Sequence, residues 1–117
     1  MNDKPTLKLR MRVTQSDLIA VGPGKIALLE ALEETRSISA AAKALGMSYR
    51  RAWMLIDELN RSLKSPAVSS AIGGKSGGGS EVTEVGRQLV ALYRGIEEQA
   101  VQACQSDIKK LMRLFAR

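Results

Sequence analysis

The sequence predicts a mainly α-helical fold with a small β component (α+β), on three observations. Apolar residues recur at spacings of three and four in several long segments, which is the period of an amphipathic helix. Two short apolar patches flank a glycine-rich stretch at 73–80, as in a hairpin with a long tip. Aromatic residues make up only 3% of the 117 residues, against 44% apolar residues in all, so aliphatic side chains must build the core. This length allows one compact domain and one extended element.

The first predicted element is a strand from Leu7 to Val13. Apolar residues there alternate strictly with cations, and a period of two is typical of a half-buried strand. The apolar patch 18–21 follows a polar break and could pair back on this strand as a hairpin. The cations on the polar face of the strand are Lys8, Arg10 and Arg12.

A helix is expected from about Pro23 to Glu34, because proline is tolerated in the first turn of a helix. Its glutamates would face solvent. The buried face is predicted to hold Ile26, Leu28, Leu29 and Leu32.

The sharpest local pattern lies within 38–55 and predicts a helix-turn-helix. Two short helices can cross closely only where a small side chain lies between them, and Ala42 supplies it. Gly46 suits the tight turn, because glycine readily adopts the left-handed conformation that ends many helices. The N-cap candidates are Ser37 and Ser39 for the first helix and Ser48 for the second.

The second helix of this motif is expected to run from Ser48 to about Leu63. Its first turn is predicted to read base edges, because the N-terminal part of a recognition helix lies in the major groove of DNA. Arginine can bridge guanine O6 and N7 with two hydrogen bonds. Two cations at a helix N-terminus oppose the macrodipole, so a phosphate-rich partner is expected there; the alternative is a pair of solvated surface arginines. The predicted base-reading residues are Ser48, Tyr49, Arg50 and Arg51, and the inward stripe is Ala52, Leu55, Ile56, Leu59 and Leu63.

Three further residues of the motif are expected at the DNA backbone, namely Ser39, Lys43 and Trp53. For Trp53 two interpretations stand side by side. The ring is either an anchor of the core or an exposed ring close to the backbone.

The glycine-rich stretch and its flanks, about 68–83, are predicted to form a wing. Lys75 would contact a phosphate, and the glycines would allow close approach to the sugar-phosphate backbone; the alternative is a plain disordered linker. A nucleotide-binding loop is rejected, because Ser69 stands at the position of its first glycine and no helix follows directly. The wing residues expected at the backbone are Gly74, Lys75 and Ser76.

A single long helix is expected from Thr83 toward Phe115. Its apolar stripe is too long for so small a domain to bury, and pairing with a second copy would cover it; the alternative is that the helix folds back on its own domain. We therefore divide the chain into a DNA-binding part, 1–83, and a dimerisation helix, 84–117, within one structural unit. The residues predicted at the dimer interface are Leu89, Leu92, Ile96, Ala100, Ala103 and Leu111.

Composition narrows the function. The formal charge is +6 and the isoelectric point is about 9.8, which favours a polyanionic partner. Histidine is absent and cysteine occurs once, so the usual catalytic sets and multi-thiolate metal sites cannot form, and we expect no enzyme, no metal and no cofactor. The sequence shows neither a signal-peptide pattern nor a stretch of transmembrane length, so we expect a cytoplasmic protein without a membrane partner.

The segment 37–53, Ser-Ile-Ser-Ala-Ala-Ala-Lys-Ala-Leu-Gly-Met-Ser-Tyr-Arg-Arg-Ala-Trp, resembles the N-terminal domain of ModE-type molybdate-responsive regulators, which share their winged helix with LysR-type regulators. The loop 73–79 followed by Val-Thr-Glu-Val-Gly at 82–86 resembles the wing and the last helix of that family. The likeness extends from about Leu7 to Ala100.

The resemblance implies a winged helix-turn-helix homodimer that binds near-palindromic operators in double-stranded DNA. There are two departures from the family pattern. Arg36 stands where such domains often have glycine, so we expect the turn before the motif to differ from theirs. The chain ends at Arg117 without the molybdate-binding β-barrels, so we expect a DNA-binding domain standing alone, without molybdate sensing.

Taken together, the residues predict a sequence-specific DNA-binding transcription regulator. Its recognition helix would lie in the major groove and its glycine-rich wing on the backbone. The alternative is a winged helix that docks a protein or RNA without binding a specific DNA sequence.

Overall fold

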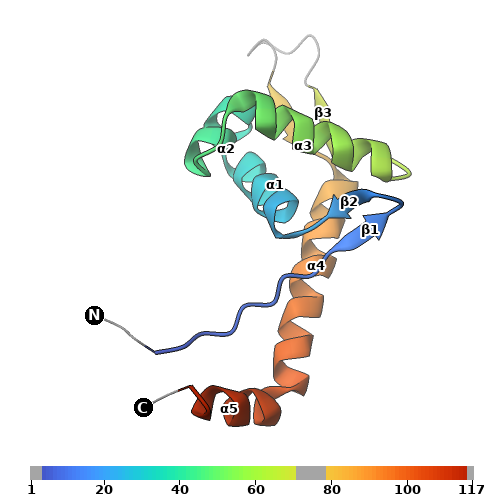
Figure 1. Ribbon diagram of the computed structural model, residues 1–117. Coiled ribbons are helices and arrows are strands. Elements are labelled where there is room, and N and C mark those ends of the chain that lie inside the picture. Colours follow the sequence, from blue (N-terminus) through green and yellow to red (C-terminus); the bar gives the residue numbers. More distant parts are fainter. Residues whose placement is uncertain (1–3, 71–78, 116–117) are drawn as a thin grey trace.

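A helical head sits at one end of a long helix (Figure 1). The computed structural model describes residues 4–70 and 79–115. Its helices are α1 (Pro23–Thr35), α2 (Ile38–Ala44), α3 (Tyr49–Ser62), α4 (Glu84–Ala103) and α5 (Gln105–Arg113), and its strands are β1 (Val13–Gln15), β2 (Leu18–Val21), β3 (Val68–Ser70) and β4 (Ser80–Val82). The predicted α+β winged-helix class is confirmed.

Helix α1 lies at the centre of the head. Its predicted apolar face is at most 1% exposed and packs against α2, α3 and the start of α4. Lys25 is also buried, because its amine pairs with Glu58 of α3 at 3.1 Å and donates to the Ile19 carbonyl. This burial of a lysine was not predicted, since only the fold brings Glu58 opposite it.

Arg36 forms the turn between α1 and α2. Its φ is +58°, in the left-handed region that favours glycine, and its N–H donates to the Leu32 carbonyl at 2.7 Å. The arginine thus adopts the conformation that a glycine would take there. Ser37 follows and caps α2 by accepting a hydrogen bond from the Ala40 N–H at 3.1 Å.

The first hairpin pairs β1 with β2 and is shorter than the predicted strand. Residues 4–12 form no strand, so the predicted start at Leu7 was wrong. Strand β2 has only four residues, and its register places Val13 opposite Val21, so β2 does not extend far enough to pair with residues 4–12. The alternation survives in part, because Leu9 and Met11 are half-buried while the cations between them are exposed.

The second hairpin pairs β3 with β4, where the wing was predicted. Asn60 of α3 holds its base: its Oδ1 accepts from the Ala67 N–H at 2.8 Å, and its Nδ2 donates to the Val68 carbonyl at 3.0 Å. The tip residues 71–78 lie outside the described residues. Among them are three predicted contacts, Gly74, Lys75 and Ser76.

The predicted single C-terminal helix is in fact two. Helix α4 ends at Ala103. Cys104, whose φ and ψ are −104° and 14°, joins it to α5, which leaves at a steep angle (Figure 1). No glycine or proline marks this break in the sequence. The continuous apolar stripe therefore predicted one unbroken helix. The charges suit two helices, because Asp107 lies in the first turn of α5 and Lys110 and Arg113 in its last, as the macrodipole favours.

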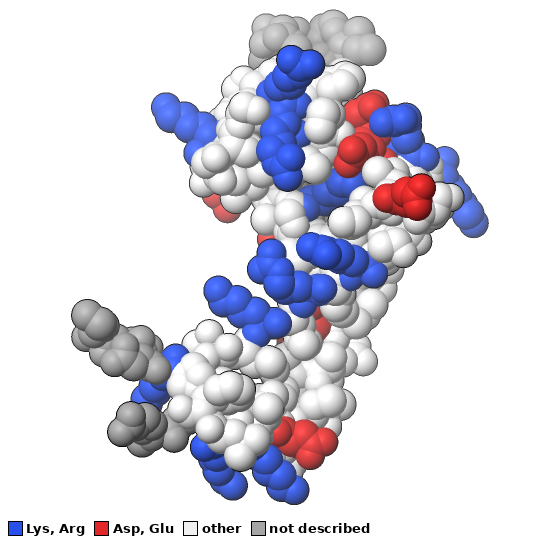
Figure 2. All heavy atoms as spheres, viewed as in Figure 1, with Lys and Arg blue, Asp and Glu red and all other residues white. Residues whose placement is uncertain are grey.

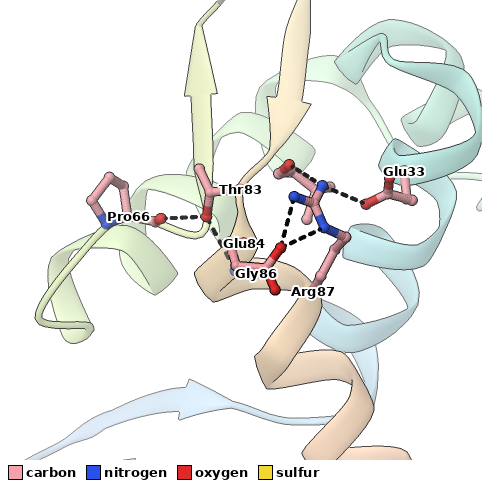
Figure 3. A network of polar contacts seen from close by, with 7 residues as sticks. Glu33, Pro66, Thr83, Glu84, Gly86 and Arg87 are labelled. Carbon is pink, nitrogen blue, oxygen red and sulfur yellow. Dashed lines mark hydrogen bonds and ion pairs between the residues drawn. The ribbon is translucent and has the colours of Figure 1, made fainter.

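Helix α4 begins with a set of polar contacts to the head (Figure 3). The Thr83 hydroxyl donates to the Pro66 carbonyl at 2.7 Å and accepts from the Gly86 N–H at 3.1 Å. Arg87 binds Glu84 at 3.0 Å and comes within 3.8 Å of Glu33 on α1.

Gly86 allows this close packing. A Cβ at this position would lie 2.5 Å from the Ala67 carbonyl oxygen and 2.6 Å from Val82 Cγ1. Every larger residue would push α4 away from the base of the second hairpin.

Further along, α4 is held by Tyr93 and Arg94. The buried Tyr93 hydroxyl donates to the Met11 carbonyl at 2.8 Å, and burial raises the pKa of this phenol, which keeps the donating proton in place. Arg94 binds Glu30 of α1 through two hydrogen bonds of 2.7 and 2.9 Å, and this contact lowers the pKa of the Glu30 carboxyl. The first half of α4 therefore belongs to the head.

The second half of α4 and α5 extend away from the head. The radius of gyration is 17.1 Å, against about 13 Å for a compact domain of this length. Helix α5 has no buried residue. None of the helices within 4–70 and 79–115 is long and apolar enough to cross a membrane.

Candidate nucleic-acid interface

The turn between α2 and α3 is closed by backbone hydrogen bonds. The Met47 N–H donates to the Ala42 carbonyl at 3.0 Å and the Gly46 N–H to the Lys43 carbonyl at 3.1 Å, which is the Schellman arrangement. Gly46 has a φ of +69°, as the turn requires. The predicted role of this glycine is confirmed.

Small residues bring the two helices together. Ala41, Ala42 and Ala52 are each at most 2% exposed and belong to the core cluster. Larger side chains at these positions would move α3 relative to α2. The angle between α2 and α3 is thus fixed by the packing of these alanines and by the hydrogen-bonded turn.

The first turn of α3 projects outward. The Ser48 hydroxyl caps the helix by accepting from the Arg51 N–H at 3.1 Å. The Tyr49 side chain is 55% exposed, and Arg50 and Arg51 are exposed as well. Neither arginine forms an ion pair with any residue in the described part of the chain. The positions predicted to read bases are therefore accessible.

Trp53 lies one turn further along α3 and is 50% exposed, which excludes the core-anchor interpretation. Met54 beside it is also exposed. On α2, the predicted backbone contacts Ser39 and Lys43 are exposed too. All the predicted contact residues within the described helices thus lie on the surface.

The sequence reasoning missed a basic groove beside α3. A depression of about 310 Å³ lies between α3 and the start of α1, and its walls include Arg10, Arg12 and Arg51. Basic side chains gather over α3 and along the N-terminal segment on one face of the molecule (Figure 2). The three cations at 8–12 were visible in the sequence but were interpreted only as the solvent face of a strand.

Apart from the buried Lys25, which pairs with Glu58 in this groove, the cations that form ion pairs lie elsewhere. Arg87 and Arg94 of α4 bind carboxylates of α1 and of α4 itself, and Arg61 binds Asp57 toward the end of α3. Four of the paired carboxylates, Glu30, Glu33, Glu84 and Glu97, lie on α1 and α4. The arginines beside the first turn of α3 form no ion pair with any residue that the structure describes.

A metal site has no basis in the part of the chain that the structure describes, where no three His, Cys, Asp or Glu residues lie close enough together to hold an ion. Cys104 is exposed at the junction of α4 and α5 and makes no disulfide.

These elements define the class of the protein. Residues 24–87, from the start of α1 to the first turn of α4, match the family model of bacterial regulatory helix-turn-helix proteins of the lysR family. The chain belongs to this family. Its members are transcription regulators and not enzymes, in agreement with the expectation from the sequence.

Within the family the chain is similar to ModE-type regulators, as segment 37–53 indicated. It is 44% identical over 78 residues to the molybdenum transport protein ModE of Azotobacter vinelandii, covering 67% of this chain and 29% of that protein. It is 39% identical over 105 residues to the DNA-binding transcriptional dual regulator ModE of Escherichia coli K12, covering 87% of this chain and 38% of that protein.

The match to the transcriptional regulator ModE of Yersinia pestis takes in nearly the whole chain. The two are 37% identical over 114 residues, which is 95% of this chain and 41% of that protein. The chain therefore spans less than half the length of these three relatives.

Proposed function

We propose that this chain is a sequence-specific DNA-binding transcription regulator that acts as a homodimer on a near-palindromic operator. The observation that carries the proposal is the exposed first turn of α3, where Tyr49, Arg50 and Arg51 project from a helix that is capped and held against the core. A regulator of this kind would act in the cytoplasm, where the bacterial chromosome lies.

Helix α3 has the dimensions for this role. Its 14 residues span about 21 Å, and the major groove of B-DNA, about 12 Å wide, admits one helix. Arg50 and Arg51 would read guanine edges, with Ser48 and Tyr49 beside them. Ser39, Lys43 and Trp53 would meet the flanking phosphates.

In this proposal, the second hairpin is the wing that contacts DNA. Asn60 and the paired strands β3 and β4 support its base next to α3. Residues 74–76 would follow the sugar-phosphate backbone, with Lys75 on a phosphate.

The dimer would form through residues 84–117. Leu92 and Ile96 lie one turn apart on α4 and are 58% and 53% exposed, which is unusual for large apolar residues on one helix face. A two-fold pairing of α4 and α5 would cover them together with Ala100, Ala103 and Leu111. Leu89 packs partly against the core of its own protomer and would border the interface.

The first test is selection of bound duplexes from a random pool. We expect one enriched motif with two half-sites about one helical turn apart, roughly 34 Å, because a two-fold dimer presents two recognition helices. A pool that remains random, or a footprint on a protein or RNA with none on DNA, would contradict the proposal.

The second test assigns the roles. Arg50→Ala and Arg51→Ala should each relax base preference by about 1–3 kcal/mol at one position, whereas Lys75→Ala should weaken binding to all sequences alike. Lys110→Ala on α5 removes one charge away from the proposed interface with DNA and serves as the control. Equal losses on selected and random duplexes for every variant would refute the assignment.

A further inference from the structure

We propose that Arg10 and Arg12, together with Arg51 and the start of α1, form a second DNA-backbone site beside the recognition helix. The inference rests on the proposed DNA binding and adds a contact that neither the helix-turn-helix nor the wing provides. Its occupant would be the sugar-phosphate backbone of the same duplex, on the side of α3 away from the wing.

The site is a groove with basic walls. Arg10 and Arg12 come from the N-terminal segment, and Arg51 comes from the first turn of α3. The space between them, about 310 Å³, is open to solvent. Arg51 is therefore shared between this groove and the face that would enter the major groove, so a duplex on α3 would pass the mouth of the groove.

The charge in the groove is not cancelled from within. Glu58 also lines it, but this carboxylate binds the buried Lys25 amine at 3.1 Å. The pair is neutral as a unit. Arg10, Arg12 and Arg51 form no ion pair within residues 4–70 and 79–115, so three positive charges remain for a polyanion.

The N-terminal segment is fixed in position, which lowers the entropy cost of the contact. The Met11 carbonyl accepts a hydrogen bond of 2.8 Å from the buried Tyr93 hydroxyl of α4. A Cβ on Gly22 would lie 3.2 Å from Arg12 Cγ, so the aliphatic part of that arginine rests on the chain just before α1. The two arginines on either side of Met11 are thus held near α3 before any ligand arrives.

The start of α1 adds backbone donors to this cluster. Gly22 is the N-cap and makes no side-chain cap, and Pro23 follows without an N–H. The next backbone N–H, that of Gly24, lies at the positive end of the helix macrodipole and in the same groove. This N–H by itself would not make a binding site, but here three arginine side chains face the same space.

The second hairpin and the N-terminal segment, which carries two arginines of the groove, lie on opposite sides of α3 (Figure 1). A duplex lying along α3 would meet the hairpin on one side and the basic N-terminal segment on the other. The segment runs on the side where α4 leads away from the head, and this is where a second protomer would pair. The proposed contact therefore falls toward the centre of the operator, between the two half-sites.

The decisive variant is Arg10→Gln/Arg12→Gln. Both side chains are exposed, and glutamine keeps the Cβ and Cγ methylene groups, so folding should be unaffected. Because the proposed dimer carries two copies of each arginine, the slope of log affinity against log salt should become shallower by about four, with the selected base motif unchanged. Phosphates protected between the half-sites in the wild-type footprint should become accessible. The control is Lys109→Gln/Lys110→Gln on α5, which removes the same charge elsewhere and should leave the slope as it was.

A second variant separates binding from folding. A Cβ on Gly24 meets no atom within 4 Å, so the backbone there accepts a side chain, and Gly24→Glu adds an acidic residue to the first turn of α1. We expect a higher melting temperature but weaker DNA binding, a combination that damage to the fold cannot produce. Ser106→Glu, at the second position of α5, is the matched control and should leave DNA binding unchanged.

The outcomes distinguish the two proposals. If wild-type protein selects no DNA sequence, the proposed function itself fails. If wild-type protein selects a motif while Arg10→Gln/Arg12→Gln keeps the wild-type salt slope and footprint, only the second backbone site is refuted. A change in the motif itself would also refute it, because phosphate contacts carry no base information.

Discussion

Arg36 has a strained backbone conformation that the turn between α1 and α2 requires. Its φ of +58° lies where a Cβ crowds the following carbonyl, yet its N–H donates to Leu32 and its carbonyl accepts from the Ser80 N–H at 3.3 Å. The turn therefore ends α1, starts α2 and contacts β4 at once. The surrounding hydrogen bonds hold the arginine in a conformation that it would not choose alone.

Replacing Arg36 with glycine should stabilise the protein by about 0.5–1 kcal/mol, because glycine populates the left-handed region without strain, which outweighs its larger freedom in the unfolded chain. Urea unfolding of both proteins measures the difference. Arg36→Ala keeps the Cβ and should bring no gain. A gain of the same size in the alanine variant would show that the arginine side chain, and not the backbone, was the cause.

Two helical glycines give an opposed pair of predictions. Gly86→Ala should destabilise the protein by about 1–3 kcal/mol, because the new Cβ would meet the Ala67 carbonyl and Val82. Gly24→Ala meets nothing within 4 Å and should stabilise by about 0.5–1 kcal/mol. Thermal unfolding compares them, and similar effects of both substitutions would contradict the packing described for α4.

At the scale of elements, the contact between α1 and α4 sets the orientation of α4 relative to the head. Arg94 bridges Glu30 of α1 and Glu97 of its own helix. Elsewhere in the first half of α4, Gly86 packs against the base of the second hairpin and Tyr93 donates to the Met11 carbonyl. Without these contacts, nothing would hold α4 against α1. They therefore fix the direction in which the rest of α4 leaves the head.

The Glu30–Arg94 ion pair should make the contact between α1 and α4 sensitive to acid. The pKa of Glu30 is lowered in the folded protein, so its contribution is present above the ordinary glutamate pKa and is lost as the pH falls through the folded value. The difference in unfolding free energy between wild type and Glu30→Gln, at most about 1 kcal/mol for so exposed a pair, should shrink from about pH 6 to about pH 3. Glu34→Gln changes an exposed glutamate for which the described residues show no ion pair, and the same trend in that variant would argue against the contact.

At the scale of the whole molecule, one protomer leaves too much apolar surface uncovered. Leu92, Ile96, Leu111 and Phe115 are all exposed on α4, on α5 or just beyond. Soluble monomers rarely present such a stretch, and a second copy would remove it from water. Dimer formation would also set the spacing of the two α3 helices.

Ile96→Glu should convert the protein to a monomer, because each dimer would bury two new charges near the two-fold axis. Sedimentation equilibrium should give about twice 12.7 kDa for wild type and 12.7 kDa for the variant. Gln102→Glu adds the same charge on another side of α4 and should remain dimeric. A monomeric wild type at micromolar concentration would remove the basis for the two-fold operator.

Much of the recognition motif could be predicted because its determinants are local. Ser37, Gly46 and Ser48 cap and end helices through hydrogen bonds to residues within five positions, and these contacts form in the structure as expected. The exposure of Tyr49 follows from the same helical period. Such contacts depend on a few neighbouring residues, so the sequence itself contains them.

The basic groove, the buried Lys25 and the break at Cys104 could not be predicted in the same way. Arg10 and Arg51 are far apart in the chain, and only packing of the N-terminal segment against α4 places them on one groove. The sequence alone determined the helix-turn-helix, its caps and the excess of positive charge. The tertiary structure decided where that charge gathers, because distances between remote residues depend on the packing of whole elements and not on local backbone preference.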